Sequence, residues 1–137
     1  MKHSHAVVWL DHVNAIVIGF ERESSETQRI KHSGGESHLH HRRGTVGSGH
    51  AAEDPDYYES IVAALRDVTE VLVVGPANAK LELVKHIHKR HHELVDRLMG
   101  VETLDHPSEG QLLKFAREYF LAADRLRAGT GIAMQPK

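Results

Sequence analysis

The segment Val71–Val74 is a run of four apolar residues that leads directly into Gly75 and Pro76, and it constrains the fold more than any other part of the sequence. The run is too short for a typical helix, and its two faces are equally apolar, so it predicts a strand that is buried on both sides. Such strands belong to α/β domains, in which helices cover the faces of a sheet. The segment therefore predicts an α/β fold.

Three further strands are expected before residue 32. The apolar runs Ala6–Leu10 and Ala15–Ile18 flank a polar break and predict a hairpin of two buried strands. Residues 27–31 alternate more in polarity and predict a strand at or near the edge of the sheet. The N-terminal part of the chain is thus expected to form an antiparallel meander.

Two helices are expected around the buried run. Asp54 and Pro55 predict the start of the first, which should end near Arg66. Asn78 predicts the cap of the second helix. The expected apolar face of this helix consists of Leu81, Val84, Ile87 and either His88 or His91.

The C-terminal part adds a strand and a helix. Residues 99–104 predict the last strand, while Ser108 and Gln111 have the spacing of a capping box and predict a helix to about Arg127. Residues 129–137 have little to bury and are expected to fray. The order of elements predicts one domain over residues 1–128, with a ribonuclease-H-like mixed sheet of about five strands and parallel strands in its second half.

Composition narrows the classes of function. The chain has no cysteine, which excludes disulfides, thiolate metal sites and cysteine nucleophiles. Its 17 Lys and Arg against 19 Asp and Glu exclude a protein that coats nucleic acid through overall positive charge. The N-terminus lacks the features of a signal peptide, and no apolar stretch approaches the length that spans a bilayer, so a soluble cytoplasmic protein without membrane contact is expected.

Residues 32–53 contain almost no apolar side chains and predict a long flexible loop after the third strand. Between residues 32 and 50, five histidines and two arginines accompany a single acid, Glu36. Guanidinium and imidazole groups suit phosphate contacts, so the loop is a candidate RNA-binding segment. The expected RNA-binding residues are Ser37, His38, His40, His41, Arg42 and Arg43. The alternative is a solvated loop whose histidines have no specific role.

The segments 75–80, 100–103 and 106–110 resemble the second half of the middle domain of the peptide chain release factor and Pelota family. The resemblance covers most of the chain, which is also similar to small bacterial translational machinery proteins. It implies a ribosome-associated, RNA-binding role in release, rescue or the response to stalling. The implied partners are the ribosome, transfer RNA or ribosomal RNA, and no cofactor is implied.

Gly34, Gly35 and Glu36 fall in the loop where this family carries its Gly-Gly-Gln motif. The resemblance implies that the two glycines shape the backbone at the peptidyl transferase centre, while Glu36 or a neighbouring histidine positions water. Glu36 replaces the glutamine of the family, and a carboxylate opposes a developing oxyanion. Stimulated hydrolysis of peptidyl-tRNA and non-catalytic RNA binding therefore both stay open.

Other residue patterns carry weaker hypotheses. One is a metal site, formed by His38, His40 and His41 or by His88 and His92, which lie four apart on an expected helix. It belongs to a competing class: a histidine-rich metal-binding or stress-related interaction module without a translational role. No physiological metal site is assigned, because such tracts more often form a solvated basic surface.

Two acidic patterns have ordinary structural explanations. Asp11, Glu102 and Asp105 could hold metal ions in a nuclease, but the run ending at Pro76 supplies no further carboxylate, so surface and capping acids are favoured. Residues 105–108 combine an acid, an imidazole and a hydroxyl, and are expected to form a capping turn. Association of two copies through the edge strand is an open alternative.

Overall fold

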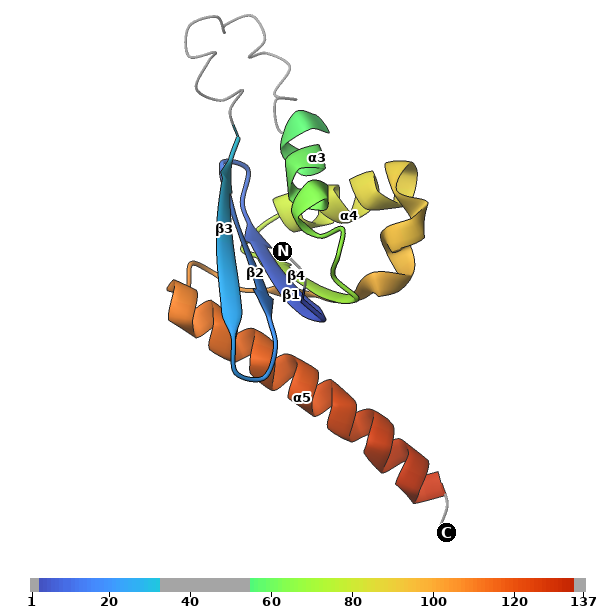
Figure 1. Ribbon diagram of the computed structural model, residues 1–137. Helices are drawn as coiled ribbons and strands as arrows, with labels where there is room; N and C mark the ends of the chain where they lie inside the picture. Colours follow the sequence, from blue (N-terminus) through green and yellow to red (C-terminus); the bar gives the residue numbers. More distant parts are fainter. Residues whose placement is uncertain (1–2, 33–54, 135–137) are drawn as a thin grey trace, which may run out of the picture. The chain divides into compact units, whose positions relative to one another are not determined.

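The N-terminal unit contains a five-stranded sheet in the computed structural model, which describes residues 3–32 and 55–134 (Figure 1). The strands, in chain order, are β1 (His5–Leu10), β2 (Asn14–Phe20), β3 (Ser25–Lys31), β4 (Glu70–Gly75) and β5 (Leu98–Thr103). Their spatial order is β3-β2-β1-β4-β5. β1, β2 and β3 pair antiparallel, whereas β4 pairs parallel with β1 and with β5. The mixed α/β sheet and the edge position of β3 are confirmed.

The parallel pairing brings the carboxyl ends of β1, β4 and β5 to one edge of the sheet. At this edge a Cβ atom on Gly75 would overlap the carbonyl oxygen of Leu10, so only glycine permits the observed approach of β4 to β1. The carbonyl of Gly75 also accepts a hydrogen bond of 3.0 Å from the backbone N–H of Leu104. The end of β5 is thereby fixed beside the other two strand ends.

Helices α3 (Pro55–Ala64) and α4 (Ala79–Arg90) lie on one face of the sheet (Figure 1). The α3 side chains Tyr58, Ile61 and Val62 join the same core cluster as inward residues of β1 and β4. The opposite residues of these strands, such as Val7 and Leu72, are also fully buried. The prediction that β4 is buried on both sides is confirmed.

The predicted apolar face of α4 is partly wrong. Ala79, Leu83 and Ile87 are buried at intervals of four residues, while Leu81 is 50% exposed. Leu83 takes the central place because it lies one helical turn from each of the other two. Asn78 is the N-cap residue of α4, as predicted, although its side chain makes no capping hydrogen bond.

The 3₁₀ helix η2 (His92–Arg97) connects α4 to β5. The guanidinium group of Arg97 donates hydrogen bonds to the carbonyls of Arg66 and Val68, at 3.0 and 3.1 Å. These bonds attach η2 to the segment that enters β4. The histidine-rich tract is consequently divided between two helices.

A second compact unit, which begins at Pro107, consists mainly of helix α5 (Glu109–Met134). Its capping box is confirmed: the Ser108 N–H donates to the Gln111 side chain at 2.8 Å, and the Gln111 N–H donates to Ser108 Oγ at 3.1 Å. The helix continues to Met134, beyond the expected end at Arg127 and into the segment expected to fray. Within the described ranges, α5 and the shorter helices all lack an apolar stretch able to cross a membrane.

Candidate functional site

The residues expected to act in catalysis and RNA binding lie outside the described residues. They are Gly34, Gly35, Glu36, Ser37, His38, His40, His41, Arg42 and Arg43. Their roles stay predictions. The structure does describe the residues on either side of this segment, His32 and Pro55.

The chain on either side of residues 33–54 is held at the end of β1. His32 is buried, its ring centroid lies 5.0 Å from that of Tyr57, and its backbone N–H donates to the carbonyl of Val13 at 2.8 Å. The Tyr57 hydroxyl donates to the carbonyl of Asp11 at 2.9 Å. Burial, with a smaller effect of the Asp11 carboxylate, raises the pKa of Tyr57, so the hydroxyl remains a donor.

A basic hollow of about 520 Å³ lies between the start of α3 and the outer side of α4. It is lined by Pro55, Tyr58, Glu82, Lys85, His86, His88, Lys89 and Arg90. Lys85, Lys89 and Arg90 are all exposed, and Lys85 and Lys89 lie one turn apart on the side of α4 opposite Leu83 and Ile87. Lys89 and Arg90 occupy the last turn, where the helix dipole favours positive charge.

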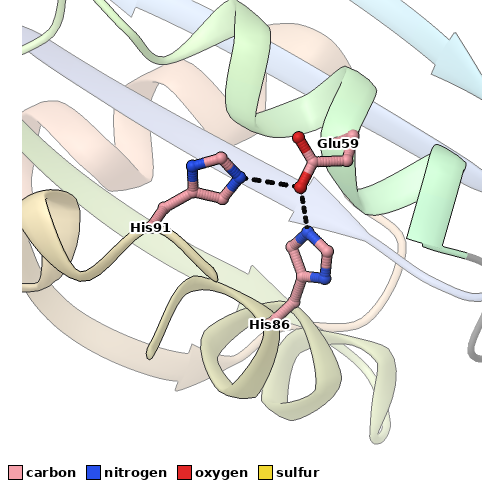
Figure 2. A group of neighbouring side chains, drawn as sticks. All are labelled: Glu59, His86 and His91. Carbon is pink, nitrogen blue, oxygen red and sulfur yellow. Dashed lines mark hydrogen bonds and ion pairs between the residues drawn. The ribbon is translucent and has the colours of Figure 1, made fainter. Parts of the chain in front are cut away.

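Beside this hollow, Glu59, His86 and His91 form a cluster that we call the α3–α4 cluster (Figure 2). Glu59 Oε2 lies 2.6 Å from Nε2 of His86 and 2.7 Å from Nε2 of His91. The side chains of the two histidines are 9% and 13% exposed, and that of Glu59 is 39% exposed. One carboxylate oxygen thus bridges two largely enclosed imidazoles.

Each member of the α3–α4 cluster is positioned by local structure. Glu59 lies on α3 and His86 on α4, and His91 is the residue that ends α4, where its backbone N–H donates to the Ile87 carbonyl at 2.8 Å. The hydrogen bond from His91, followed by that from His86, lowers the pKa of Glu59 against the opposing effect of burial. The carboxylate is therefore held in its charged form.

Sequence reasoning missed this cluster. The prediction that His88 and His92 lie four apart on one helix is wrong, because α4 ends at Arg90 and His92 begins η2. The cluster instead uses histidines five residues apart across a helix end. No periodic signal marks such a pair, and Glu59 is distant in sequence.

A second group of residues, the sheet-edge cluster, lies at the carboxyl ends of β1 and β5 and comprises Trp9, Asp11, Asp105 and His106. His106 Nδ1 lies 2.9 Å from Asp105 Oδ1, and its Nε2 lies 3.6 Å from Asp11 Oδ2. The indole N–H of Trp9 donates to the carbonyls of Leu104 and Asp105, at 3.1 and 2.6 Å. The hydrogen bond with Asp105 is the main cause that raises the pKa of His106.

The sheet-edge cluster does not form the nuclease site considered from sequence. Asp11 Oδ1 accepts the backbone N–H groups of Val13 and Asn14 at 2.8 and 2.7 Å, as expected of a turn-capping acid. Glu102 lies within β5. In the described part of the chain, the α3–α4 cluster is the group of three or more metal-ligating side chains whose ligand atoms converge within 4.8 Å.

Comparison with solved structures identifies proteins that share this fold. No family model and no curated protein matched the chain. Its fold is that of a domain found in translation termination and quality-control factors: the Pelota protein of Archaeoglobus fulgidus matches with a TM-score of 0.57 and 15% identity, over 97% of this chain and 41% of that one. The Thermoplasma acidophilum Pelota protein also matches with a TM-score of 0.57 and 15% identity, over 83% of this chain and 32% of that one.

The archaeal translation termination factor aRF1 matches with a TM-score of 0.57 and 13% identity, over 96% of this chain and 42% of that one. Dom34 of Saccharomyces cerevisiae, described as a translation termination-like factor that interacts with Hbs1, matches with a TM-score of 0.55 and 13% identity, over 95% of this chain and 37% of that one. This chain spans about a third to two fifths of the length of these proteins. The fold implied by the sequence resemblance is confirmed.

Proposed function

We propose that this protein acts in translation as a ribosome-associated, RNA-binding domain, with a role in release, rescue or the response to stalling. The fold shared with Pelota and aRF1 carries this proposal. The matches reach 97% of the chain, which supports treating residues 1–128 as one domain of this type. The ribosome, with its ribosomal RNA or transfer RNA, is the proposed partner.

The basic hollow supports a local contact with RNA. Lys85, Lys89 and Arg90 are three exposed cations that line this hollow. Because the formal net charge of the chain is -2, attraction to phosphates must come from such a local concentration of cations. The hollow also includes Pro55, which is adjacent in sequence to the segment containing Arg42 and Arg43.

Sedimentation with ribosomes over a range of salt concentrations tests the proposal. The triple variant Lys85→Ala, Lys89→Ala, Arg90→Ala should weaken binding at least about tenfold and reduce the slope of log affinity against log salt by about 1 for each phosphate that the protein no longer neutralises. A variant with Arg42→Ala and Arg43→Ala should act in the same direction. If the unaltered protein stays in the supernatant at both low and high salt, the translational role is wrong.

The matched control removes three cations elsewhere. Arg22, Arg66 and Arg125 are exposed and lie outside the basic hollow. The triple alanine variant at these positions changes the net charge by the same amount as the α4 variant. It should retain wild-type ribosome binding; an equal loss in both variants would show a nonspecific charge effect and contradict the hollow as the contact surface.

Catalysis is a separate element of the proposal, based on the resemblance of Gly34-Gly35-Glu36 to the family motif. Gly35→Ala should abolish stimulated release of peptide from peptidyl-tRNA on ribosomes while leaving ribosome binding unchanged. Glu36→Gln should increase release, because it removes a negative charge beside the developing oxyanion. Release that is unaffected by Gly35→Ala would leave RNA binding without hydrolysis as the function.

A further inference from the structure

We infer that Glu59, His86 and His91 form a binding site for a divalent transition-metal ion of the zinc type. The inference is independent of the translational proposal, since it rests only on the ligand atoms of the α3–α4 cluster. Three such atoms, one oxygen and two nitrogens, lie within 4.8 Å of one another. Two histidines and one glutamate, with a fourth position open to water, are a recurrent zinc-ligand set in proteins.

The two distances between Nε2 and Glu59 Oε2 need only a small change to accept an ion. Both Nε2 atoms point to the same oxygen, at 2.6 and 2.7 Å (Figure 2). In a tetrahedral site with bonds of about 2.0 Å, neighbouring ligand atoms lie about 3.3 Å apart, so each imidazole would move away from Glu59 by roughly 0.6 Å. An ion bound by all three atoms would replace the two contacts that now join each Nε2 to Glu59 Oε2.

Metal binding requires the proton of each neutral imidazole to reside on Nδ1, since Nε2 becomes the ligand. For His91 the carboxylate of Glu93 is the candidate acceptor: its Oε2 lies 3.7 Å from Nδ1, just beyond hydrogen-bond range, and a small side-chain movement would form the bond. A carboxylate behind a metal-bound histidine orients the ring and raises its basicity. Glu93 is thus a positioning residue in the inferred site.

The surroundings favour a zinc-type ion over magnesium or calcium. Two of the three ligands are imidazole nitrogens, whereas magnesium and calcium require oxygen ligands. Glu59 and His86 come from packed helices, since Ile61 of α3 and Ile87 of α4 are fully buried close in sequence to them, and His91 is the C-cap residue of α4. Glu59 remains 39% exposed, which leaves access for the ion and for a water molecule.

Titration of the untagged, chelator-treated full chain with Zn²⁺ by calorimetry tests the site. We expect one ion per chain at the cluster. Glu59→Gln, His86→Gln and His91→Gln should each weaken binding at least about 100-fold, more than the loss of an outer-shell partner. Glu93→Gln should weaken it about tenfold. Unchanged affinity in the three ligand variants would overturn the inference.

Two controls separate this site from other histidines. His88→Gln and His92→Gln alter other histidines of the same tract and should leave the affinity unchanged. A variant with His38, His40 and His41 all changed to Gln should also retain the ion. Loss of binding in that variant, with retention in the ligand variants, would assign the metal to residues 38–41 and refute the α3–α4 site.

Substitution with Co²⁺ supplies a readout of geometry that does not depend on activity. Tetrahedral coordination by the cluster should give intense visible absorption bands, which His91→Gln should abolish while circular dichroism shows an unchanged fold. Weak octahedral bands identical in the wild type and in His91→Gln would contradict the inference. Ribosome sedimentation without added metal tests the translational proposal separately, so failure of one does not imply failure of the other.

Discussion

The α3–α4 cluster and the sheet-edge cluster both combine histidine with carboxylate, but in opposite proportions. In the first, the single carboxylate of Glu59 lies between two imidazoles whose side chains are at most 13% exposed. In the second, the 64% exposed imidazole of His106 lies between the carboxylates of Asp105 and Asp11. Accordingly, the pKa of Glu59 is lowered in the first cluster, whereas the pKa of His106 is raised in the second.

The difference shows that histidine and carboxylate side chains can form either a metal-ligand set or a surface ion pair, depending on their number and burial. Two enclosed nitrogens around one oxygen form a ligand set for a metal ion, because each nitrogen lone pair becomes available when its proton moves to the other ring nitrogen. One exposed imidazole between two carboxylates forms an ordinary ion pair, and solvent screens most of its energy. Four substitutions test this contrast.

The largest effect is expected at the strand ends that support the sheet-edge cluster. Gly75→Ala should destabilise the fold by about 3 kcal/mol, because the new methyl group overlaps the Leu10 carbonyl and forces two central strands apart. Chemical denaturation measures the loss. Gly110→Ala is the matched control, since a Cβ there meets no atom within 4 Å and favours the helix. Equal stability of the two variants would contradict the close approach.

Trp9→Phe should cost about 2 kcal/mol, from the loss of the indole donor and of buried volume. The backbone carbonyls of Leu104 and Asp105 would both lose their hydrogen bond from Trp9. Exchange of backbone amide protons near His106 should accelerate, while amides of α4 remain protected. Uniform acceleration throughout the N-terminal unit would show that the indole does not hold this edge specifically.

Glu59→Gln without metal should destabilise the protein by about 1 kcal/mol, less than a fully buried charged hydrogen bond contributes, because the Glu59 side chain is 39% exposed. Denaturation in the presence of a chelator measures this value. Glu82→Gln provides the control: its carboxylate lies 4.0 Å from the exposed Lys85 ammonium, so its replacement should have almost no effect. If Glu59→Gln lowered the free energy of unfolding no more than Glu82→Gln does, the contacts of Glu59 with the two imidazoles would not stabilise the fold.

The smallest effect is expected at His106, and it should depend on pH. The pKa of His106 is raised in the folded protein, mainly by its hydrogen bond with Asp105, so protonated His106 stabilises the fold below the unfolded pKa of about 6.5. This stabilisation is lost as pH rises through the folded pKa. His106→Gln should therefore be slightly less stable than wild type at a pH about one unit below 6.5 and equal to it well above the folded pKa.

Titration followed by NMR provides the direct measurement. The ring of His106 should titrate above 6.5, and Asp105→Asn should lower its pKa toward that value. A ring that titrates below 6.5 in the wild type would show that Asp105 and Asp11 do not stabilise the imidazolium.

The amino-acid sequence alone was sufficient to predict much of the fold. The apolar runs that became β1, β2 and β4, the alternating edge strand β3 and the capping box of α5 were all confirmed. Each depends on side-chain periodicity or on hydrogen bonds between residues close in sequence, so local physical chemistry determines it. The resemblance to the release factor and Pelota family pointed to the same fold.

Tertiary structure decided the α3–α4 cluster. His91 reaches Glu59 only because α4 ends after Arg90, and Glu59 reaches His86 only because α3 and α4 lie on the same face of the sheet. The burial of Leu83 in place of Leu81 was likewise set by how α4 packs. Sequence periodicity specifies which residues share one side of an element; packing between elements distant in sequence determines which side chains meet, and with them the chemistry of a site.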